Sequence, residues 1–264
     1  MKFLYQSLAE LERTNASAAL CTVVKSSGST PRHVGSKMLV YPDGKFIGTV
    51  GGGELENRVR QAAAESLKDG EARSLVYNMS DPSHGDVGVC GGTVEVFVEP
   101  ILPPPLLIVI GAGHVGKAVA HLAKWLGFRV AVSDDRVEFC NAKTVPDADA
   151  YYPVTMDKLP EHVQVTRQTY LVLTTRGSDV DAAGLAPLLE TEAAYIGIIG
   201  SKRRWTETVK AMKAQGVSAE KIGRVHSPIG LELQAETPEE IAVSIMAEVL
   251  MVRGRGTGKA MSEK

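Results

Sequence analysis

The sequence lacks three features that would place it in a specialised class: many cysteines, a long apolar run and an excess of charge of one sign. The only cysteines are Cys21, Cys90 and Cys140, widely spaced, which argues against a disulfide framework and a zinc knuckle. No apolar run reaches the roughly 18 to 20 residues that a membrane helix needs. The formal net charge of -2 leaves no broad basic field for nucleic acid or an anionic membrane.

The N-terminal stretch, MKFLYQSLAELERTNAS, alternates apolar and charged residues at helical spacing. It has no uninterrupted apolar core before a small-residue cleavage site, so it is not a signal peptide. We therefore expect a cytoplasmic protein whose thiols stay free. The chain of 264 residues is long enough for two modest domains, and it shows no internal repeat.

A run of three prolines, Pro103 to Pro105, separates two apolar segments in EPILPPPLLIVI. Proline has no backbone donor and favours an extended chain, so this run predicts a stiff linker. We expect a first domain over residues 1–101, a linker over 102–105 and a second domain over 106–253. The polar, glycine-bearing residues 254–264 form a tail.

The first domain is predicted to be α+β. A helical N-terminus is followed by a β-branched run and a hairpin whose turn is Pro42-Asp43-Gly44. Good helix formers then extend to Gly70, which suits the position after a helix end. Two further strand-like segments, RSLVYNMS and TVEVFVEP, complete the domain.

The second domain alternates short apolar strands with amphipathic helices. Strands are predicted at 106–110, 129–135, 169–175 and 193–200, and the last helix begins at Pro238 with acids in its first turn. This alternation predicts a doubly wound parallel sheet with helices on both faces. The fold class is therefore α/β, an α+β domain followed by a Rossmann-like domain.

A dinucleotide-binding glycine pattern lies between the first strand and first helix of this second domain, in LLIVIGAGHVGKAVA. Gly111 would allow the tight turn, Gly113 would let the backbone approach a pyrophosphate, and Gly116 would let the helix pack on the sheet. The helix start would offer free amides to the phosphates. The alternative is a Rossmann-type domain that has lost its nucleotide.

The acidic residue expected after the second strand is present as Asp134 or Asp135, either of which would hydrogen-bond a ribose hydroxyl. Arg136 would instead meet a 2′-phosphate, so the choice between NAD and NADP stays open.

Two further loops are predicted at the carboxyl ends of strands, where ligands bind in open α/β sheets. A cationic helix start beside glycine, as at Arg203, suits an anionic ligand, although a solvated helix start has the same pattern. The polar residues of the two loops are Arg176, Ser178, Asp179 and Asp181, and Ser201, Lys202, Arg203 and Arg204.

The histidines give one candidate acid-base group, His226 in RVHSPIG, although a single histidine without a visible partner is more often structural. His114 lies in the glycine loop and would cover the phosphate site. The remaining histidines, His33, His84, His121 and His162, have no metal-ligand spacing, so we assign no metal site to them.

Three stretches of the first domain are unusual. SSGSTPRHVGSKM combines hydroxyls, glycines and Arg32. GTVGGGELE runs Gly51, Gly52 and Gly53 into a helix, where backbone amides would wrap an anion, or Glu54 would cap them. GVCGG places Cys90 before Gly91 and Gly92. The bland interpretation is a set of turns that need glycine dihedrals.

These stretches together resemble the xanthine dehydrogenase accessory proteins, the XdhC/CoxI family. GSTPRHVGSKMLV, GTVGGGELE and CGGTVEVFVEP are similar to the signatures of that family's first domain. VIGAGHVGKAVA, VSDDR, YIGIIGSKRR and HSPIGLELQAETPEEIAVSIMAE are similar to those of its second domain. The resemblance runs in order from about residue 20 to about residue 252.

The resemblance implies a protein that binds the molybdenum cofactor (molybdopterin) and shields it while a cysteine desulfurase supplies the terminal sulfido ligand. Such a protein then delivers the cofactor to xanthine dehydrogenase or a related molybdenum hydroxylase. The cofactor would lie against the GTVGGGELE and GVCGG loops. We expect a homodimer, because a carrier gains from burying an oxygen-sensitive ligand at an interface.

Within this resemblance Cys90 becomes the candidate for contact with molybdenum or for sulfur handling, because sulfur is a soft ligand. The alternative is a small buried hydrophobe, the role that we assign to Cys21 and Cys140. Ser178 departs from the histidine found in many relatives, which puts the second domain's site in doubt. That domain would hold NAD(P), part of a dinucleotide form of the cofactor, or nothing.

Two alternative functions remain from the residues alone. The glycine loop and its acid would suit an NAD(P)-dependent oxidoreductase, although no catalytic pair is evident in the sequence. They would equally suit a nucleotide-sensing regulator, although no basic DNA-reading helix is present.

Overall fold

The structure is a computed structural model that describes residues 2–14, 16–79, 87 and 91–263. The chain divides into two compact units, Met1–Pro103 and Pro104–Lys264, each of which is described by itself. In the described part of the chain, no helix combines the length and the apolar character that a membrane span requires.

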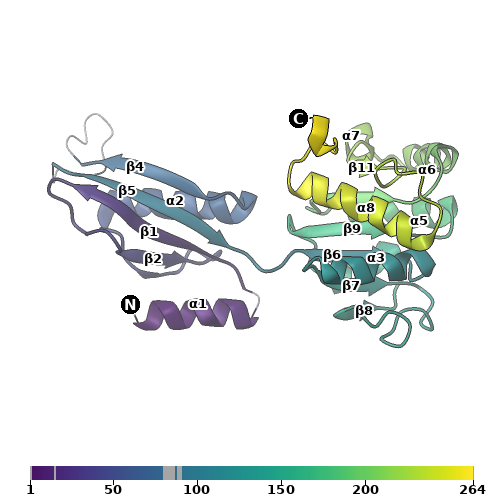
Figure 1. Cartoon of the computed structure of the whole chain (residues 1–264), viewed down its shortest axis with the longest axis horizontal. Coiled ribbons are helices and arrows are strands. Elements are labelled where there is room, and N and C mark those ends of the chain that lie inside the picture. Colours follow the sequence, from purple (N-terminus) through teal and green to yellow (C-terminus); the bar gives the residue numbers. More distant parts are fainter. Residues whose placement is uncertain (1, 15, 80–86, 88–90, 264) are drawn as a thin grey trace. The chain divides into compact units, whose positions relative to one another are not determined.

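The first unit is an antiparallel sheet with one helix on each face (Figure 1). The strand order is β3-β2-β1-β5-β4, and every neighbouring pair is antiparallel. Its elements are α1 (Lys2–Thr14), β1 (Ala18–Ser27), β2 (Lys37–Val40), β3 (Phe46–Gly48), α2 (Gly53–Asp69), β4 (Arg73–Asn78) and β5 (Thr93–Ile101).

The two helices cover opposite faces because side chains alternate along β1. Cys21 and Val23 pack in the main core with α2, whereas Ala18 packs with Leu4 and Leu11 of α1. Helix α2 ends as the sequence predicted: Gly70 is left-handed (φ 78°) and its N–H donates to the Ser66 carbonyl. The α+β prediction for this part is confirmed.

The second unit is a six-stranded sheet in which every neighbouring pair is parallel, in the order β11-β10-β9-β6-β7-β8. The unit's first strand lies in the middle and the chain winds outward in both directions, the usual order of dinucleotide-binding folds. Its strands are β6 (Leu106–Ile110), β7 (Arg129–Ser133), β8 (Ala150–Tyr152), β9 (Thr169–Leu173), β10 (Tyr195–Ile198) and β11 (Val225–His226).

Helices lie on both faces of this sheet. Their bounds are α3 (His114–Trp125), α4 (Leu159–His162), α5 (Ser178–Leu189), α6 (Lys202–Ala214), α7 (Ala219–Ile222) and α8 (Pro238–Arg253), with 3-10 turns η2 (Met156–Lys158) and η3 (Met261–Glu263). Alternate residues of β6 enter two different cores: Val109 packs with α3 and α8, and Ile108 packs with α5 and α6. The Rossmann-like, doubly wound parallel sheet is therefore confirmed.

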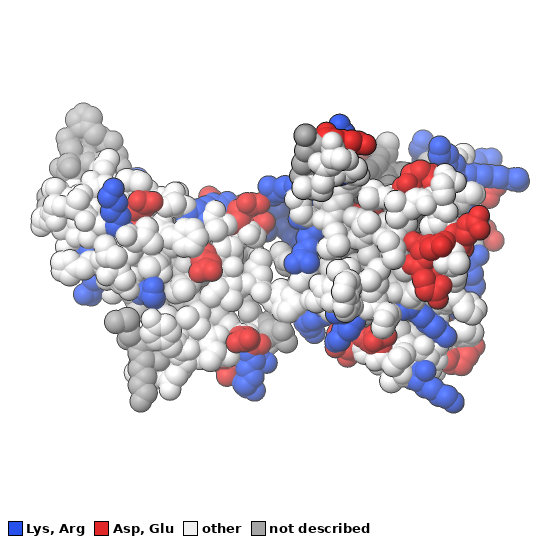
Figure 2. All heavy atoms as spheres, in the orientation of Figure 1, with Lys and Arg blue, Asp and Glu red and all other residues white. Residues whose placement is uncertain are grey.

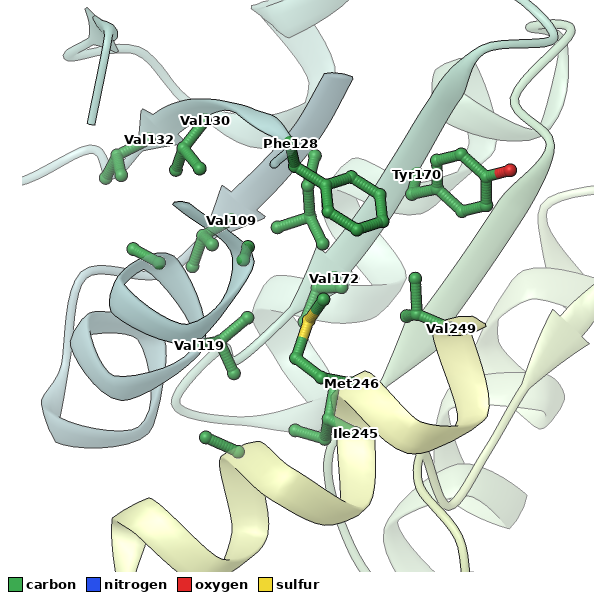
Figure 3. Packing of buried hydrophobic residues seen from close by; sticks show 14 of the residues in the cluster. Val109, Val119, Phe128, Val130, Val132, Tyr170, Val172, Ile245, Met246 and Val249 are labelled. Atoms are coloured by element: carbon green, nitrogen blue, oxygen red, sulfur yellow. The ribbon is translucent and has the colours of Figure 1, made fainter. Parts of the chain in front are cut away.

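Figure 3 shows the core on the α3 and α8 face. Val119 of α3 and Met246 and Val249 of α8 point towards the strands, where they meet Val109 and Phe128. Phe128 also packs edge-on against Tyr170, with ring centroids 5.7 Å apart. This packing anchors α3 to the sheet just after the glycine loop.

The start of α8 is fixed by a capping box, in which Thr237 accepts from the Glu240 N–H and the Glu240 carboxylate accepts from the Thr237 N–H. Pro238 occupies the first helical turn, as predicted. On the face of the second unit drawn in Figure 2, basic and acidic side chains are interspersed.

Candidate functional site

The glycine loop closes tightly over the switch point between β6 and β9. Gly111 has φ 108°, and a Cβ there would lie 2.6 Å from the Thr174 carbonyl oxygen. A Cβ on Gly116 would lie only 2.0 Å from the Gly111 carbonyl oxygen. The Thr174 hydroxyl donates to that same oxygen at 2.6 Å. Both glycines are therefore required by packing.

Gly113 is different, because a Cβ there would meet nothing within 4 Å. It is the N-cap of α3, and its dihedrals (φ -73°, ψ -170°) are open to any residue. No side chain caps this helix start. The amides of a helix's first turn have no intrahelical acceptors, and the open space beside Gly113 would let an anionic group approach them.

A cavity of about 390 Å³ opens beside this loop. It extends from the glycine loop across the end of β7 to the turn after β8 and the start of α5. It is lined by Ile110, Gly111, Gly113, Ser133, Asp134, Asp135, Arg136, Val154, Thr155, Met156, Asp157, Thr174, Thr175, Arg176, Val180, Ala183 and Gly184. This mixture of apolar and polar side chains is typical of a ligand pocket at the carboxyl ends of parallel strands.

Asp134 is buried, and both its oxygens are occupied within the protein. Its Oδ2 accepts from the Ala112 N–H at 2.8 Å, which ties β7 to the glycine loop. Arg136 binds both oxygens, with Nε 2.9 Å from Oδ1 and Nη2 2.8 Å from Oδ2. Burial alone would raise the pKa of Asp134, but the bonds from Arg136 and Ala112 outweigh it and lower that pKa. Asp134 is therefore ionised, and its role in the structure is to hold the glycine loop against the end of β7.

Asp135, by contrast, faces the cavity with its side chain 41% exposed. It pairs with Arg176, whose Nη2 lies 2.7 Å from Oδ2. The Arg136 guanidinium lies over the ring of Phe139, with 4.0 Å between the guanidinium carbon and the ring centroid. Of the two carboxylates that the sequence left open for a ribose, the geometry favours Asp135.

The loops after β9 and β10 are joined by a buried ion pair. Asp181 of α5 is fully buried and accepts from Nε and Nη2 of Arg204 at 2.9 and 2.7 Å. Arg204 also reaches the hydroxyl and carbonyl of Thr175, and that hydroxyl donates to Asp181. The neighbouring Arg203 is exposed and pairs only loosely with Glu207, at 3.4 Å. Arg203 lines neither the cavity beside the glycine loop nor the hollow beside His121. It is Arg204 that points inward, to the buried Asp181.

His226 has a partner that the sequence did not reveal. Its Nδ1 lies 2.8 Å from Oε1 of Glu248, which comes from the middle of α8. Glu248 also accepts from the Tyr195 hydroxyl at 2.8 Å and from the Gly230 N–H at 2.5 Å. The only sequence signal was a single acid inside the apolar stretch IAVSIMAEVLMV.

His114 lines a second cavity instead of the first. This hollow, of about 510 Å³, lies between α3, the start of α8 and residues 144–147. Lys117 and His121 of α3 face it too, and His121 pairs with Asp147 at 3.1 Å. His114 therefore does not line the cavity beside Gly111 and Gly113, and the expectation that it covers a phosphate site there has no support from its position.

In the first unit, two of the glycine stretches meet at one loop. A Cβ on Gly28 would lie 2.8 Å from the Gly91 carbonyl oxygen, and a Cβ on Gly92 would lie 2.2 Å from the Ser29 carbonyl oxygen. Gly51 contacts the same loop, because its Cβ would lie 2.9 Å from Pro31. The loop of residues 28–32 thus joins the region of Gly91 to the region of Gly51.

Gly52 and Gly53 begin α2 in left-handed conformations (φ 81° and 58°), with open space where a Cβ would lie. No side chain caps this helix: Glu54 pairs with Arg58 at 3.1 Å, and Glu56 accepts from the Thr49 hydroxyl at 2.6 Å. The suggestion that Glu54 caps the amides is therefore wrong. Arg32 lies on the loop described above and is exposed.

Cys90 and His84 lie outside the described residues, so the role predicted for Cys90 stays a prediction. Cys21 and Cys140 are both buried. Burial raises the pKa of the Cys21 thiol to about 12, and it raises that of Cys140 as well. Across the described ranges, no three histidine, cysteine or carboxylate side chains are placed to hold a metal ion.

Fold and site together define a two-unit protein: an antiparallel sheet with glycine-rich loops, and a Rossmann-like unit with a cavity beside its glycine loop. The family described as the XdhC Rossmann domain matches residues 107–249, and the XdhC and CoxI family matches residues 11–78. The chain belongs to the XdhC/CoxI family, which confirms the resemblance.

Three curated relatives illustrate this similarity. The uncharacterized protein YqeB of Escherichia coli K12 is 34% identical over 98% of this chain and 48% of its own length. A probable xanthine dehydrogenase subunit of Bacillus subtilis 168 is 31% identical over 62% and 47%. The chain thus spans about half the length of these two relatives. The molybdenum cofactor insertion chaperone PaoD of E. coli K12 is 25% identical over 89% and 83%.

Proposed function

We propose that this protein is a molybdenum cofactor maturation factor, which binds and protects the cofactor, supports its sulfuration and delivers it to a client enzyme. The observation that carries the proposal is the similarity over most of both chains to a molybdenum cofactor insertion chaperone. The client would be xanthine dehydrogenase or a related molybdenum hydroxylase, in keeping with the name of the B. subtilis relative.

The glycine-rich loops of the first unit fit such a ligand. The pyranopterin is bulky and carries a phosphate, and it needs backbone without side chains and cationic or amide donors. Gly52, Gly53 and Gly91 leave open space where a Cβ would lie, and among the described residues no side chain caps the start of α2. Arg32 on the adjoining loop would contribute a cation.

The proposal also gives Cys90 a role at the cofactor, because this residue directly precedes Gly91. A thiolate is a soft ligand for molybdenum, and it would contact the metal or handle the sulfur that a cysteine desulfurase supplies. We further propose that the protein acts in the cytoplasm as a homodimer, in which the bound cofactor is shielded.

The test is equilibrium binding of released molybdenum cofactor to wild type, Cys90→Ala and Cys140→Ala. Molybdenum is counted by mass spectrometry and the pterin by fluorescence of its oxidised form. Cys140→Ala is the matched control, because that thiol is buried beside β7 and donates to the Val132 carbonyl. Near-stoichiometric binding that weakens at least tenfold only in Cys90→Ala is expected. Absence of binding by wild type would reject the maturation role.

A second proposed property is nucleotide binding by the Rossmann unit, supported by the cavity beside Gly113 and by Asp135 at its rim. The ligand would be NAD(P) or the nucleotide part of a dinucleotide form of the cofactor. Calorimetric titration of the whole protein with NADH, NADPH and CMP discriminates these ligands. If none of the three ligands produced a heat of binding, nucleotide binding by this cavity would be rejected.

A further inference from the structure

The cluster around His226 lies outside the cavity already described, at the other half of the sheet's carboxyl edge. His226 is the last residue of β11 and pairs with Gly197 of β10. In a doubly wound sheet, a long ligand crosses the switch point and places one half over each set of strands. The cavity lies at the carboxyl ends of β6, β7, β8 and β9 and at the start of α5. His226 ends the outer strand β11, two strands beyond β9, so it lies where the far end of such a ligand would reach.

The hydrogen bonds around Glu248 determine which nitrogen of His226 carries the proton. The carboxylate accepts from the Tyr195 hydroxyl and the Gly230 N–H, and its pKa is lowered although burial opposes this, because His226, Gly230 and Tyr195 all bind it. An ionised carboxylate only accepts, so Nδ1 of His226 must donate to it. In the neutral imidazole, Nε2 is then a free acceptor.

Nε2 is also accessible. The His226 side chain is 37% exposed whereas that of Glu248 is 10% exposed. Among the described residues, Nε2 has no hydrogen-bond partner, and it is not one of the fully enclosed unpartnered atoms. The ring is held from the other side by Tyr195, with ring centroids 4.6 Å apart. The carboxylate of Glu248 therefore fixes the imidazole while leaving an exposed acceptor that a ligand could reach.

We propose that His226 contacts the ligand of the second unit, with Nε2 accepting a hydrogen bond from an N–H or O–H group of a heterocycle or sugar. Glu248 is the positioning residue that fixes the Nδ1–H tautomer. A metal is a weaker candidate, because the described residues bring no set of three ligating side chains together. This inference rests on the proposed ligand binding at the same edge of the sheet.

The first experiment is residue-resolved ethoxyformylation of wild type by diethyl pyrocarbonate, followed by mass spectrometry, with and without saturating NADH or released molybdenum cofactor. His121 is the matched control, because its Nδ1 also pairs with a carboxylate, Asp147, but on α3 beside the other hollow. We expect one of the probes to slow modification of His226 at least fivefold and to leave His121 unchanged. No protection by either probe would overturn the proposal.

The second experiment determines the tautomer and its consequence. In ¹⁵N-resolved spectra, neutral His226 of wild type should carry its proton on Nδ1, and Glu248→Gln should shift it towards Nε2. The same variant should weaken binding of the protecting probe roughly three- to tenfold, whereas a purely structural bond would leave affinity unchanged in protein that stays folded. If the cofactor binds but neither probe protects His226, this inference alone is rejected. If the cofactor does not bind, the maturation role is rejected.

Discussion

Two glycines of the loop between β6 and α3, three residues apart, should respond differently to replacement by alanine. At Gly116 the new Cβ would lie 2.0 Å from a backbone oxygen of Gly111 and 2.9 Å from the Thr174 hydroxyl oxygen. The closer contact is about an ångström shorter than real Cβ atoms reach, and backbone cannot swing aside. At Gly113 the new Cβ would meet nothing within 4 Å.

The loss of stability expected for Gly116→Ala follows from two opposing effects on the free energy of unfolding. Overpacking against a rigid backbone costs about 3 kcal/mol, and replacing glycine inside α3 returns about 1 kcal/mol of helix propensity. The net loss is about 2 kcal/mol, or roughly 4 to 8 °C in the melting temperature of a unit of this size. Gly113→Ala should change stability by less than about 1 kcal/mol, because a poorer N-cap is offset by lower entropy of the unfolded chain.

Tryptophan fluorescence measures this difference in the second unit alone, because the only tryptophans, Trp125 and Trp205, both lie there. Thermal and urea unfolding of the whole chain give the two stabilities. Titration with whichever of NADH, NADPH and CMP binds the wild type should show at least tenfold weaker binding by Gly113→Ala. A Gly116→Ala variant as stable as wild type would refute the packing argument, and equal destabilisation by both variants would refute the distinction between the two glycines.

Two other predictions concern buried groups. Asp181→Asn should lower the free energy of unfolding by about 3 kcal/mol in the same assay, because it leaves the Arg204 guanidinium without its carboxylate. Adding Arg204→Met should restore part of that loss. If the effects of the two substitutions on the free energy of unfolding simply add, the pairing is contradicted. Iodoacetamide at pH 8 should leave Cys21 and Cys140 unmodified in the folded protein, because burial raises both thiol pKa values, to about 12 for Cys21; rapid labelling of either by peptide mass spectrometry would contradict that burial.

Much of the fold could be predicted because its long elements carry strong local patterns. The apolar run at β6 is buried on both faces, and the glycines that follow it specify the turn into α3. The sequence did not predict β8 and β11, which have three and two residues. Strands this short have no periodicity of their own and form only because β7 and β10 supply a parallel edge.

The side-chain constellations were harder to predict, because they depend on register and on long separations. Adjacent arginines differ by about 100° around a helix, so the sequence could not tell that Arg204 faces inward and Arg203 outward. His226 and Glu248 lie 22 residues apart on different elements. Only the packing of α8 across the sheet brings them together.

The glycines show why a motif alone does not identify a ligand site. Gly92, Gly111 and Gly116 are glycines because a Cβ would strike backbone oxygen, a requirement of folding that holds whether or not any ligand binds. Gly52, Gly53 and Gly91 lie in open space but in left-handed conformations, so substitution there strains the backbone in any case.

Gly113 combines open space with dihedrals that any residue adopts. Folding alone does not explain a glycine at this position, because an alanine or serine would fit, and serine would cap α3 better. A ligand that approaches the backbone closely does explain it. Loss of nucleotide binding without loss of stability in Gly113→Ala would therefore be more informative than any substitution at the other glycines of the site.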